Sequence, residues 1–202
     1  VTISDSDDAG IGLGDDTALG MDITGAEIQN ITAGTVEFAT AGGVNVDNIT
    51  AANSNNIGTV LIDATGAVEF KTAASLFNAL TVESDQDVDI NVAITTDTGA
   101  LTIDADDDNG GGSGDNRIDM AAGLTLTSAT SITLDATTGG IVFAGAGTLN
   151  AANGVTINDD LTVNAGTLTI DADNDDNGAG TLTIVGAVAN ANRAITLTAD
   201  DL

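Results

Sequence analysis

Short stretches of alternating apolar and polar residues recur along the whole chain, separated by turns rich in Gly, Asn and Asp. Val, Ile, Leu and Ala alternate with Thr, Asp or Asn, which is the period expected of a strand with one buried and one solvated face. β-branched residues suit such a surface. The best helical candidates, residues 25–32 and 73–80, are both short. The pattern therefore predicts an almost all-β chain, with strands in 1–4, 35–38, 58–64, 66–70, 79–84, 87–94, 99–105, 124–129, 131–136, 140–145, 154–159, 161–172, 181–185 and 194–199.

Longer repeats favour a solenoid over a sandwich. LTIDADDDNG at 101–110 returns as LTIDADNDDNG at 168–178, and a looser copy, VTISDSDDAG, opens the chain. Repeats whose length varies only in turns are typical of solenoids. Asn-Gly turns, which favour tight hairpins, are few, and most links are Gly corners. We therefore predict that residues 1–202 form a single parallel β-helix of roughly seven to ten rungs, each about 4.8 Å high; a β-sandwich is the alternative.

The alternation also predicts which side chains fill the interior. Apolar residues on the inward face of each strand should stack from rung to rung, and the four Phe side chains, Phe38, Phe70, Phe77 and Phe143, should fill wider corners. The predicted buried set is Val36, Phe38, Leu61, Phe70, Leu101, Ile103, Ile132, Leu134, Val142, Leu168, Ile170, Leu182, Ile184, Ile195 and Leu197.

Composition excludes several classes of function. The chain has 31 Asp and Glu against 3 Lys and Arg, a net charge of −28, so a nucleic-acid partner is not expected. It has no Cys and no His, which excludes a His base, a Cys nucleophile and the usual zinc, haem and iron–sulfur sites. No apolar run reaches the ~18 residues that a membrane helix needs, so membrane insertion is not expected either.

Residues 9–70 and much of the remaining chain resemble a known type of repeat. The matching elements are IGLGD, ITAGT, ITAANSNNIGTV, LFNALTV, TTDTGALTIDAD, GLTLTSA, LDATTGGI, LNAANGVTI and GTLTIDAD. They are similar to repeats of the large filamentous-haemagglutinin-like exoproteins of bacteria. The resemblance implies a right-handed parallel β-helix in a secreted or surface-exposed rod that serves adhesion, aggregation or matrix formation. A unit of this length would be about one large repeat of a longer array.

The sharpest candidate chemistry lies in the two acidic repeats. Asp104, Asp106 and Asp108 in the first copy, and Asp171, Asp173 and Asp175 in the second, are expected to point outward on one side. Asp at positions 1, 3 and 5 resembles the start of a calcium loop, and Ca²⁺ prefers oxygen ligands. The bidentate Glu of the EF-hand is missing. The alternatives are thus a Ca²⁺ site and a solvated acidic turn, since Asp and Asn are good turn residues.

Other patterns in the sequence are weaker indications of function. Asp159 and Asp160 resemble the acidic pair of pectin hydrolases, but the chain lacks the His of that motif and the aromatic residues that stack on sugars. GGVNVDNI at 42–49 half-matches a calcium β-roll repeat and occurs once. Outward Thr resembles ice-binding solenoids, although other polar residues interrupt it. The excess of Asp also fits life in high salt. We predict no enzymatic activity.

The resulting functional prediction is an extracellular structural or adhesive rod or filament segment, stabilised by Ca²⁺. The alternative is an S-layer or biofilm-matrix protein with calcium-dependent assembly, and a polysaccharide-active enzyme comes last. Because the chain begins with the strand VTIS and ends near the strand AITLTA, with no helical cap apparent, we expect head-to-tail self-association into fibres. A cell-surface glycan or protein receptor is the other expected partner.

Overall fold

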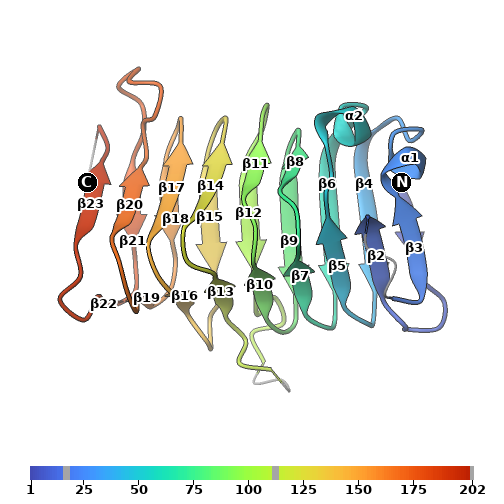
Figure 1. Cartoon of the computed structure of the whole chain (residues 1–202), viewed down its shortest axis with the longest axis horizontal. Helices are drawn as coiled ribbons and strands as arrows, with labels where there is room; N and C mark the ends of the chain where they lie inside the picture. Colours follow the sequence, from blue (N-terminus) through green and yellow to red (C-terminus); the bar gives the residue numbers. More distant parts are fainter. Residues whose placement is uncertain (16–18, 111–113, 201–202) are drawn as a thin grey trace.

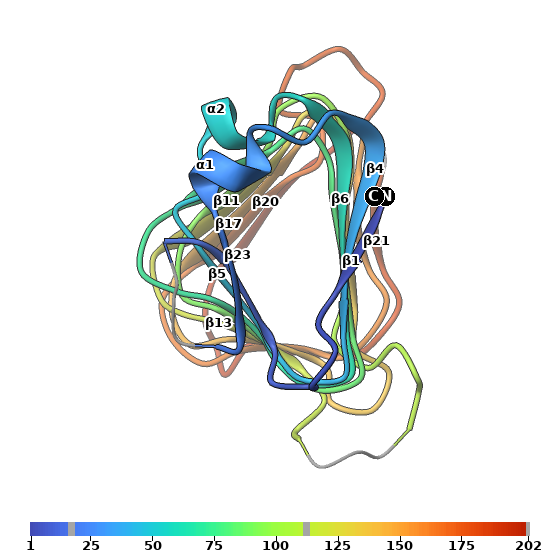
Figure 2. The ribbon, with the colours of Figure 1, turned by 90° about the vertical axis from the view of Figure 1, so that its right-hand side faces the viewer.

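The computed structural model describes residues 1–15, 19–110 and 114–200. They form a parallel β-helix of about seven turns, which confirms the predicted fold class. Strands stack side by side along the long axis of a rod, from the N-terminal end to the C-terminal end (Figure 1). A view down that axis shows three faces around one interior (Figure 2). We call these faces sheets A, B and C.

Every described strand pair in the three sheets is parallel, as expected when a chain bends at corners instead of reversing. Sheet A consists of β1 (Thr2–Ser4), β4 (Ala33–Thr40), β6 (Ile57–Ala64), β9 (Leu80–Ser84), β12 (Leu101–Asp104), β15 (Ile132–Asp135), β18 (Val155–Ile157) and β21 (Leu182–Ile184). Sheet B consists of β3 (Met21–Thr24), β2 (Ile11–Gly14), β5 (Val44–Asp47), β7 (Val68–Phe70), β10 (Val88–Ile90), β13 (Ile118–Met120), β16 (Ile141–Phe143), β19 (Leu161–Val163) and β22 (Val188–Ala189).

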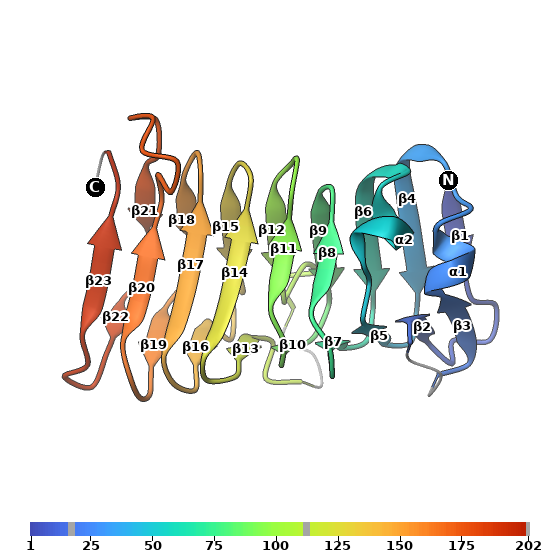
Figure 3. The same ribbon diagram turned by 45° about the horizontal axis from the view of Figure 1, so that its top comes forward.

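Sheet C covers only part of the rod's length. It consists of β8 (Ser75–Phe77), β11 (Ile94–Thr96), β14 (Leu124–Ser128), β17 (Gly147–Ala151), β20 (Leu168–Asp171) and β23 (Ile195–Thr198). Nearer the N-terminal end, two single-turn helices, α1 (Gly25–Ile28) and α2 (Ala51–Ser54), take the place of strands on this face (Figure 3). Of the two short helical candidates in the sequence, residues 25–32 contain the single turn α1. Residues 73–80 contain no helix, because Ser75–Phe77 pairs with β11.

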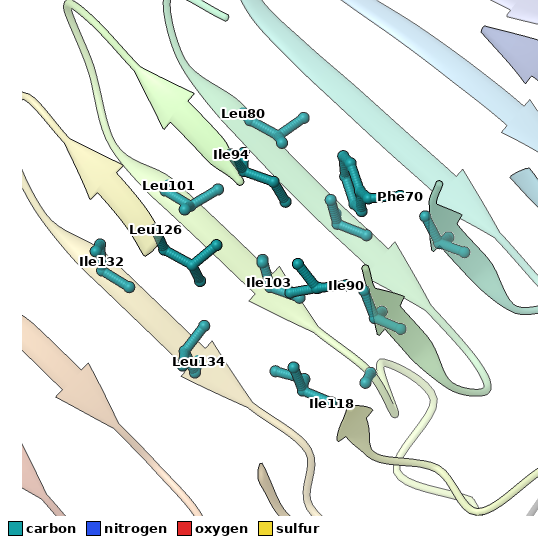
Figure 4. Close-up of a cluster of buried hydrophobic side chains, with 14 of the residues drawn as sticks. Phe70, Leu80, Ile90, Ile94, Leu101, Ile103, Ile118, Leu126, Ile132 and Leu134 are labelled. Carbon is teal, nitrogen blue, oxygen red and sulfur yellow. The ribbon is translucent and has the colours of Figure 1, made fainter. Parts of the chain in front are cut away.

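The interior consists of apolar side chains stacked from rung to rung. Leu80, Leu101 and Ile132 lie opposite one another on successive strands of sheet A, and all are buried (Figure 4). Such columns remove aliphatic surface from water at every turn, which is the main driving force for folding. The four Phe side chains are buried as predicted. Where the Phe143 ring crosses to sheet C, Gly147 leaves room, since a Cβ there would lie 2.6 Å from the ring.

Five residues of the predicted core are not fully buried, for two reasons. Leu61 and Val142 each stand in the middle of three consecutive apolar residues, and their neighbours on both sides take the inward positions. Ile184 and Ile195 are half-buried and Leu197 is 40% exposed because they belong to the last described strands of sheets A and C, beyond which no further described turn stacks. The other ten predicted core residues are buried.

The two ends of the rod differ. At the N-terminal end, β3 lies outside β2 on sheet B, and α1 follows it, so that Ile23 and Ile28 are buried over the interior. Thr24 caps this helix: its Oγ1 accepts the Glu27 N–H, and the Glu27 carboxylate accepts the Thr24 N–H in return. At the opposite end, Val185 and Val188 are 67% and 45% exposed. The expectation that neither end carries a helix was thus wrong for the N-terminal end. No described helix is long and apolar enough to cross a bilayer.

Candidate functional site

Outward carboxylates stand in register on sheet A. Asp63 lies opposite Glu83, Glu83 opposite Asp104, and Asp104 opposite Asp135. We call these four residues the sheet A ladder. Neighbouring strands lie about 4.8 Å apart, so each carboxylate has a like charge on the next rung. The ion pairs of Lys71 with Glu69 and of Arg117 with Asp115 and Asp119 involve none of these four residues.

Burial, together with crowding of like charges, raises the pKa values of Asp63, Glu83 and Asp104 in the sheet A ladder. Burial, together with the Asp107, Asp63 and Glu37 carboxylates, raises the pKa of Glu83. Burial raises the pKa of Asp104 to about 6, although a hydrogen bond from the Asp106 N–H opposes the shift. The charged forms of Glu83 and Asp104 are therefore less favourable in the folded chain than in water.

Sheet B carries a second set of outward carboxylates, with cations beside it. Glu69, Asp89 and Asp119 lie opposite one another on β7, β10 and β13, and we call them the sheet B ladder. The Lys71 Nζ lies 3.8 Å from the Glu69 Oε2, and the Arg117 Nε donates to the Asp119 Oδ2 at 2.6 Å. Burial and Asp119 still raise the pKa of Asp89, with Arg117 opposing them.

The first acidic repeat continues from β12 into residues 105–110 and 114–117, which we call loop one. The structure places its predicted ligands in different environments: Asp104 belongs to the sheet A ladder, Asp106 is buried at 0% exposure, and Asp108 is exposed. Asp106 Oδ2 accepts a hydrogen bond from the Thr138 N–H at 2.9 Å, which ties the loop to the following turn of the coil. The expectation that all three carboxylates point outward is wrong for Asp106, because hydrogen bonds draw it inward.

The second acidic repeat leaves β20 through residues 172–181, which we call loop two. Asp173 is 8% exposed and accepts hydrogen bonds from the Asn177 and Gly178 N–H groups, so the outward orientation expected for it is also wrong. Asp171 is half-buried and Asp175 is exposed. In both repeats the middle Asp thus holds its own loop together. No group of three or more carboxylates close enough to hold a metal ion is found among the described residues.

A groove of about 240 Å³ lies beside the Asp159–Asp160 pair. The Asp159 Oδ2 accepts a hydrogen bond from the Ala136 N–H at 2.9 Å, and the Asp160 Oδ1 accepts one from the Ala187 N–H at 2.7 Å. Burial and the neighbouring Asp135 raise the pKa of Asp159. Both carboxylates therefore bind the backbone of adjacent turns, a structural use that the sequence did not reveal.

Outward Thr residues do form columns. One column on sheet A consists of Thr81, Thr102, Thr133, Thr156 and Thr183, and one on sheet C consists of Thr125, Thr148, Thr169 and Thr196. Beside the first stands the sheet A ladder, and beside the second stand Asn150 and Asp171. The interruption by other polar residues that the sequence predicted is present in the neighbouring columns. GGVNVDNI lies at β5, where the Asp47 Oδ1 accepts a hydrogen bond from the Ala73 N–H.

Comparison with known proteins finds no matching family model, no matching curated protein and no matching solved structure. The fold and the arrangement of charges along the rod are therefore the basis on which a function can be argued.

Proposed function

We propose that this chain is a structural segment of a rod-like, extracellular adhesive or filamentous protein. The observation that supports the proposal is the stacking of parallel turns along one rod, with α1 and α2 in place of strands on the sheet C face near the N-terminal end. About seven turns at roughly 4.8 Å each give a length of ~35 Å. In such a coil every turn contacts chiefly its neighbours, so length can grow by addition of turns without a change in the interior.

The C-terminal end of the rod supports growth in that direction. β21, β22 and β23 are the outermost described strands of their sheets, and exposed apolar side chains lie on or beside them. Unpaired strand edges beside exposed aliphatic groups favour the addition of another strand layer. We propose that the parallel turns of a second copy cover this end.

Stacking of a second copy would be incomplete on one face. Its β1 and β3 edges offer strands to sheets A and B, but on sheet C it presents α1, which cannot continue the ladder from β23. Head-to-tail association of this chain alone is therefore a weaker contact than three continuous sheets. The net charge of −28 per copy opposes it further, and salt should favour it.

The experiment is light scattering coupled to size exclusion, over a range of protein and NaCl concentrations. We expect reversible elongated oligomers that increase with salt, and a rod-shaped monomer by small-angle X-ray scattering at low concentration. Val188→Asp, on the edge strand β22 of sheet B, should suppress association, whereas Ala189→Asp, an exposed neighbour on the same strand, serves as the charge-matched control. A compact monomer that never associates, or equal effects of both variants, would contradict the proposal.

The extracellular part of the proposal is supported by the sequence resemblance and by the acidic surface, which stays soluble without a basic partner. Surface labelling and protease treatment of intact producing cells test it directly. Accessible protein on intact cells is the expected result, and protein found only after lysis would contradict it.

A further inference from the structure

The chain contains three Asn-Gly pairs, at 109–110, 153–154 and 177–178. Asn followed by Gly is prone to spontaneous deamidation, because Gly has no side chain to hinder attack by its backbone nitrogen on the preceding side-chain amide. In a folded chain this attack requires a Gly N–H that is not held by an acceptor and an Asn side chain that is free to turn towards it. The three pairs differ in both respects.

The Asn109–Gly110 pair of loop one is held by hydrogen bonds. The Gly110 N–H donates to the Asp108 Oδ1 at 2.9 Å, and the Asn109 Nδ2 donates to the Asp107 carbonyl at 3.2 Å. The Gly nitrogen must lose its proton before it can attack, and the negative charge of a carboxylate bound to that N–H disfavours the resulting anion. The Gly110 nitrogen is therefore a poor nucleophile.

The Asn177–Gly178 pair of loop two is held in the same way. The Gly178 N–H donates to the Asp173 Oδ2 at 3.1 Å, and the Asn177 Nδ2 donates to the Asp175 Oδ2 at 2.8 Å. Asp173 is 8% exposed, so little water competes for its carboxylate. In both acidic loops a carboxylate thus occupies the nitrogen that would attack.

The Asn153–Gly154 pair lies at the corner between β17 on sheet C and β18 on sheet A. Asn153 is exposed, and among the described residues no hydrogen bond is found from its side chain or from the Gly154 N–H. Gly154 has a φ of +129°, and a Cβ there would lie 2.9 Å from the Thr181 carbonyl oxygen. The corner therefore requires Gly after Asn153, and it leaves the nitrogen of that Gly available.

We propose that Asn153 is a site of spontaneous deamidation and that Asn109 and Asn177 are protected from it. The Gly154 nitrogen gives up its proton to solvent and bonds to the Asn153 Cγ. The bond from Cγ to Nδ2 breaks, and the nitrogen takes up a proton and leaves as ammonia. Water then opens the succinimide ring at either carbonyl carbon, which gives aspartate or isoaspartate. One water is consumed and one ammonia released, with no oxidation or reduction.

Isoaspartate at this corner would disturb the coil, whether or not the rod serves in a filament. The main chain then runs through the Cβ and Cγ of residue 153, which adds one atom to the backbone between β17 and β18. Two hydrogen bonds fasten the corner to the preceding turn: the Asn153 N–H donates to the Thr130 carbonyl at 2.6 Å, and the Ile132 N–H donates to the Gly154 carbonyl at 3.0 Å. A longer backbone between these two bonds cannot satisfy both, so the modified rod should have a lower Tm.

The test is peptide mapping by mass spectrometry of the whole chain, incubated at 37 °C and pH 8.5 for several weeks. Exchange of the amide for a hydroxyl group raises the mass of the peptide that contains the modified residue. We expect deamidation of Asn153 to be about tenfold faster than that of Asn109 or Asn177, the factor that one charge-assisted hydrogen bond supplies. In concentrated guanidinium chloride the three rates should converge, because the fold no longer distinguishes the pairs.

A pair of variants tests the protection directly. Asp108→Ala frees the Gly110 N–H and should accelerate deamidation of Asn109 about tenfold. Asp107→Ala removes an equal charge from the same exposed loop but leaves that hydrogen bond in place, so the rate at Asn109 should not change. Equal native rates at all three pairs would overturn the proposal. So would an unchanged rate at Asn109 in Asp108→Ala, or rate differences that persist in guanidinium chloride.

Discussion

The two carboxylate ladders run along the same rod, but only one has cations beside it. On sheet B, Lys71 and Arg117 form ion pairs with Glu69 and Asp119, whereas these ion pairs do not extend to the sheet A ladder. In a parallel coil one outward position repeats at every turn, so an unfavourable charge is multiplied along the rod. The comparison suggests that one cation at one rung can offset part of a whole column.

The largest expected effect comes from removing that compensation. Arg117→Glu deletes the 2.6 Å contact with Asp119 and adds a further carboxylate beside Asp89. Because the Arg117–Asp119 ion pair is partly exposed, we expect the substitution to lower the free energy of unfolding by only about 2 kcal/mol. The Tm, measured by circular dichroism, should fall by roughly 4–8 °C. Arg193→Glu is the charge-matched control, and an equal loss there would show that net charge alone matters.

The converse change places a cation in the sheet A ladder. Glu83→Lys puts an ammonium group between Asp63 and Asp104. After discounting for solvent screening, we expect a gain of about 1 kcal/mol, seen as a rise in Tm at low salt. Asp97→Lys, at an exposed position outside the ladder, changes the net charge by the same amount. Equal stabilisation by both variants would mean that the location of the new cation opposite Asp63 and Asp104 has no effect on stability.

Stability should rise as the pH is lowered from 7 towards 5. The pKa values of Asp63, Glu83 and Asp104 are raised in the folded chain, that of Asp104 to about 6. The folded state therefore binds protons before the unfolded state does, and unfolding becomes less favourable as pH falls through this range. A Tm increase of a few degrees is expected in wild type and a smaller one in Glu83→Gln. A Tm that falls steadily from pH 7 to 5 contradicts this.

The smallest effect is that of salt. Between 20 mM and 500 mM NaCl the Debye length shrinks several-fold, which weakens repulsion along the exposed ladder. The Tm of wild type should rise by about 1–3 °C, and that of Glu83→Lys by less, because its attractions are screened together with its repulsions. A larger salt response in Glu83→Lys than in wild type would count against the electrostatic explanation.

The alternation of residues was enough to predict the fold and most of the interior. It failed where three apolar residues follow one another, because inward and outward positions are then indistinguishable by hydropathy. Leu61 faces outward since it lies opposite Glu37 and Thr81, and Val142 does so since it lies opposite Asp119 and Thr162. Register with neighbouring strands decides such cases, and a single strand does not contain that information.

The charge arrangement was harder to predict than the fold. Asp104 and Asp135 become neighbours only because loop one is excluded from the register between β12 and β15. The sequence shows the acidic repeat but does not show that its middle residue, Asp106, is buried. The strand β12 ends at Asp104, so the alternation of inward and outward side chains no longer holds at Asp106. The α2 turn had one usable signal: Asn53 stands three residues after Thr50 and accepts its N–H at 2.8 Å, as Glu27 does for Thr24.

The two copies of LTIDAD stand on different faces, one on sheet A and one on sheet C. The interval between them is therefore out of phase with the coil, and the motif is rotated about the rod's axis when it recurs. Loop one and loop two consequently leave the rod at opposite ends of its cross-section (Figure 2). A duplication that added a whole number of turns would have aligned both acidic loops along one edge. Instead, a neighbouring surface that approaches from either side meets a negatively charged projection.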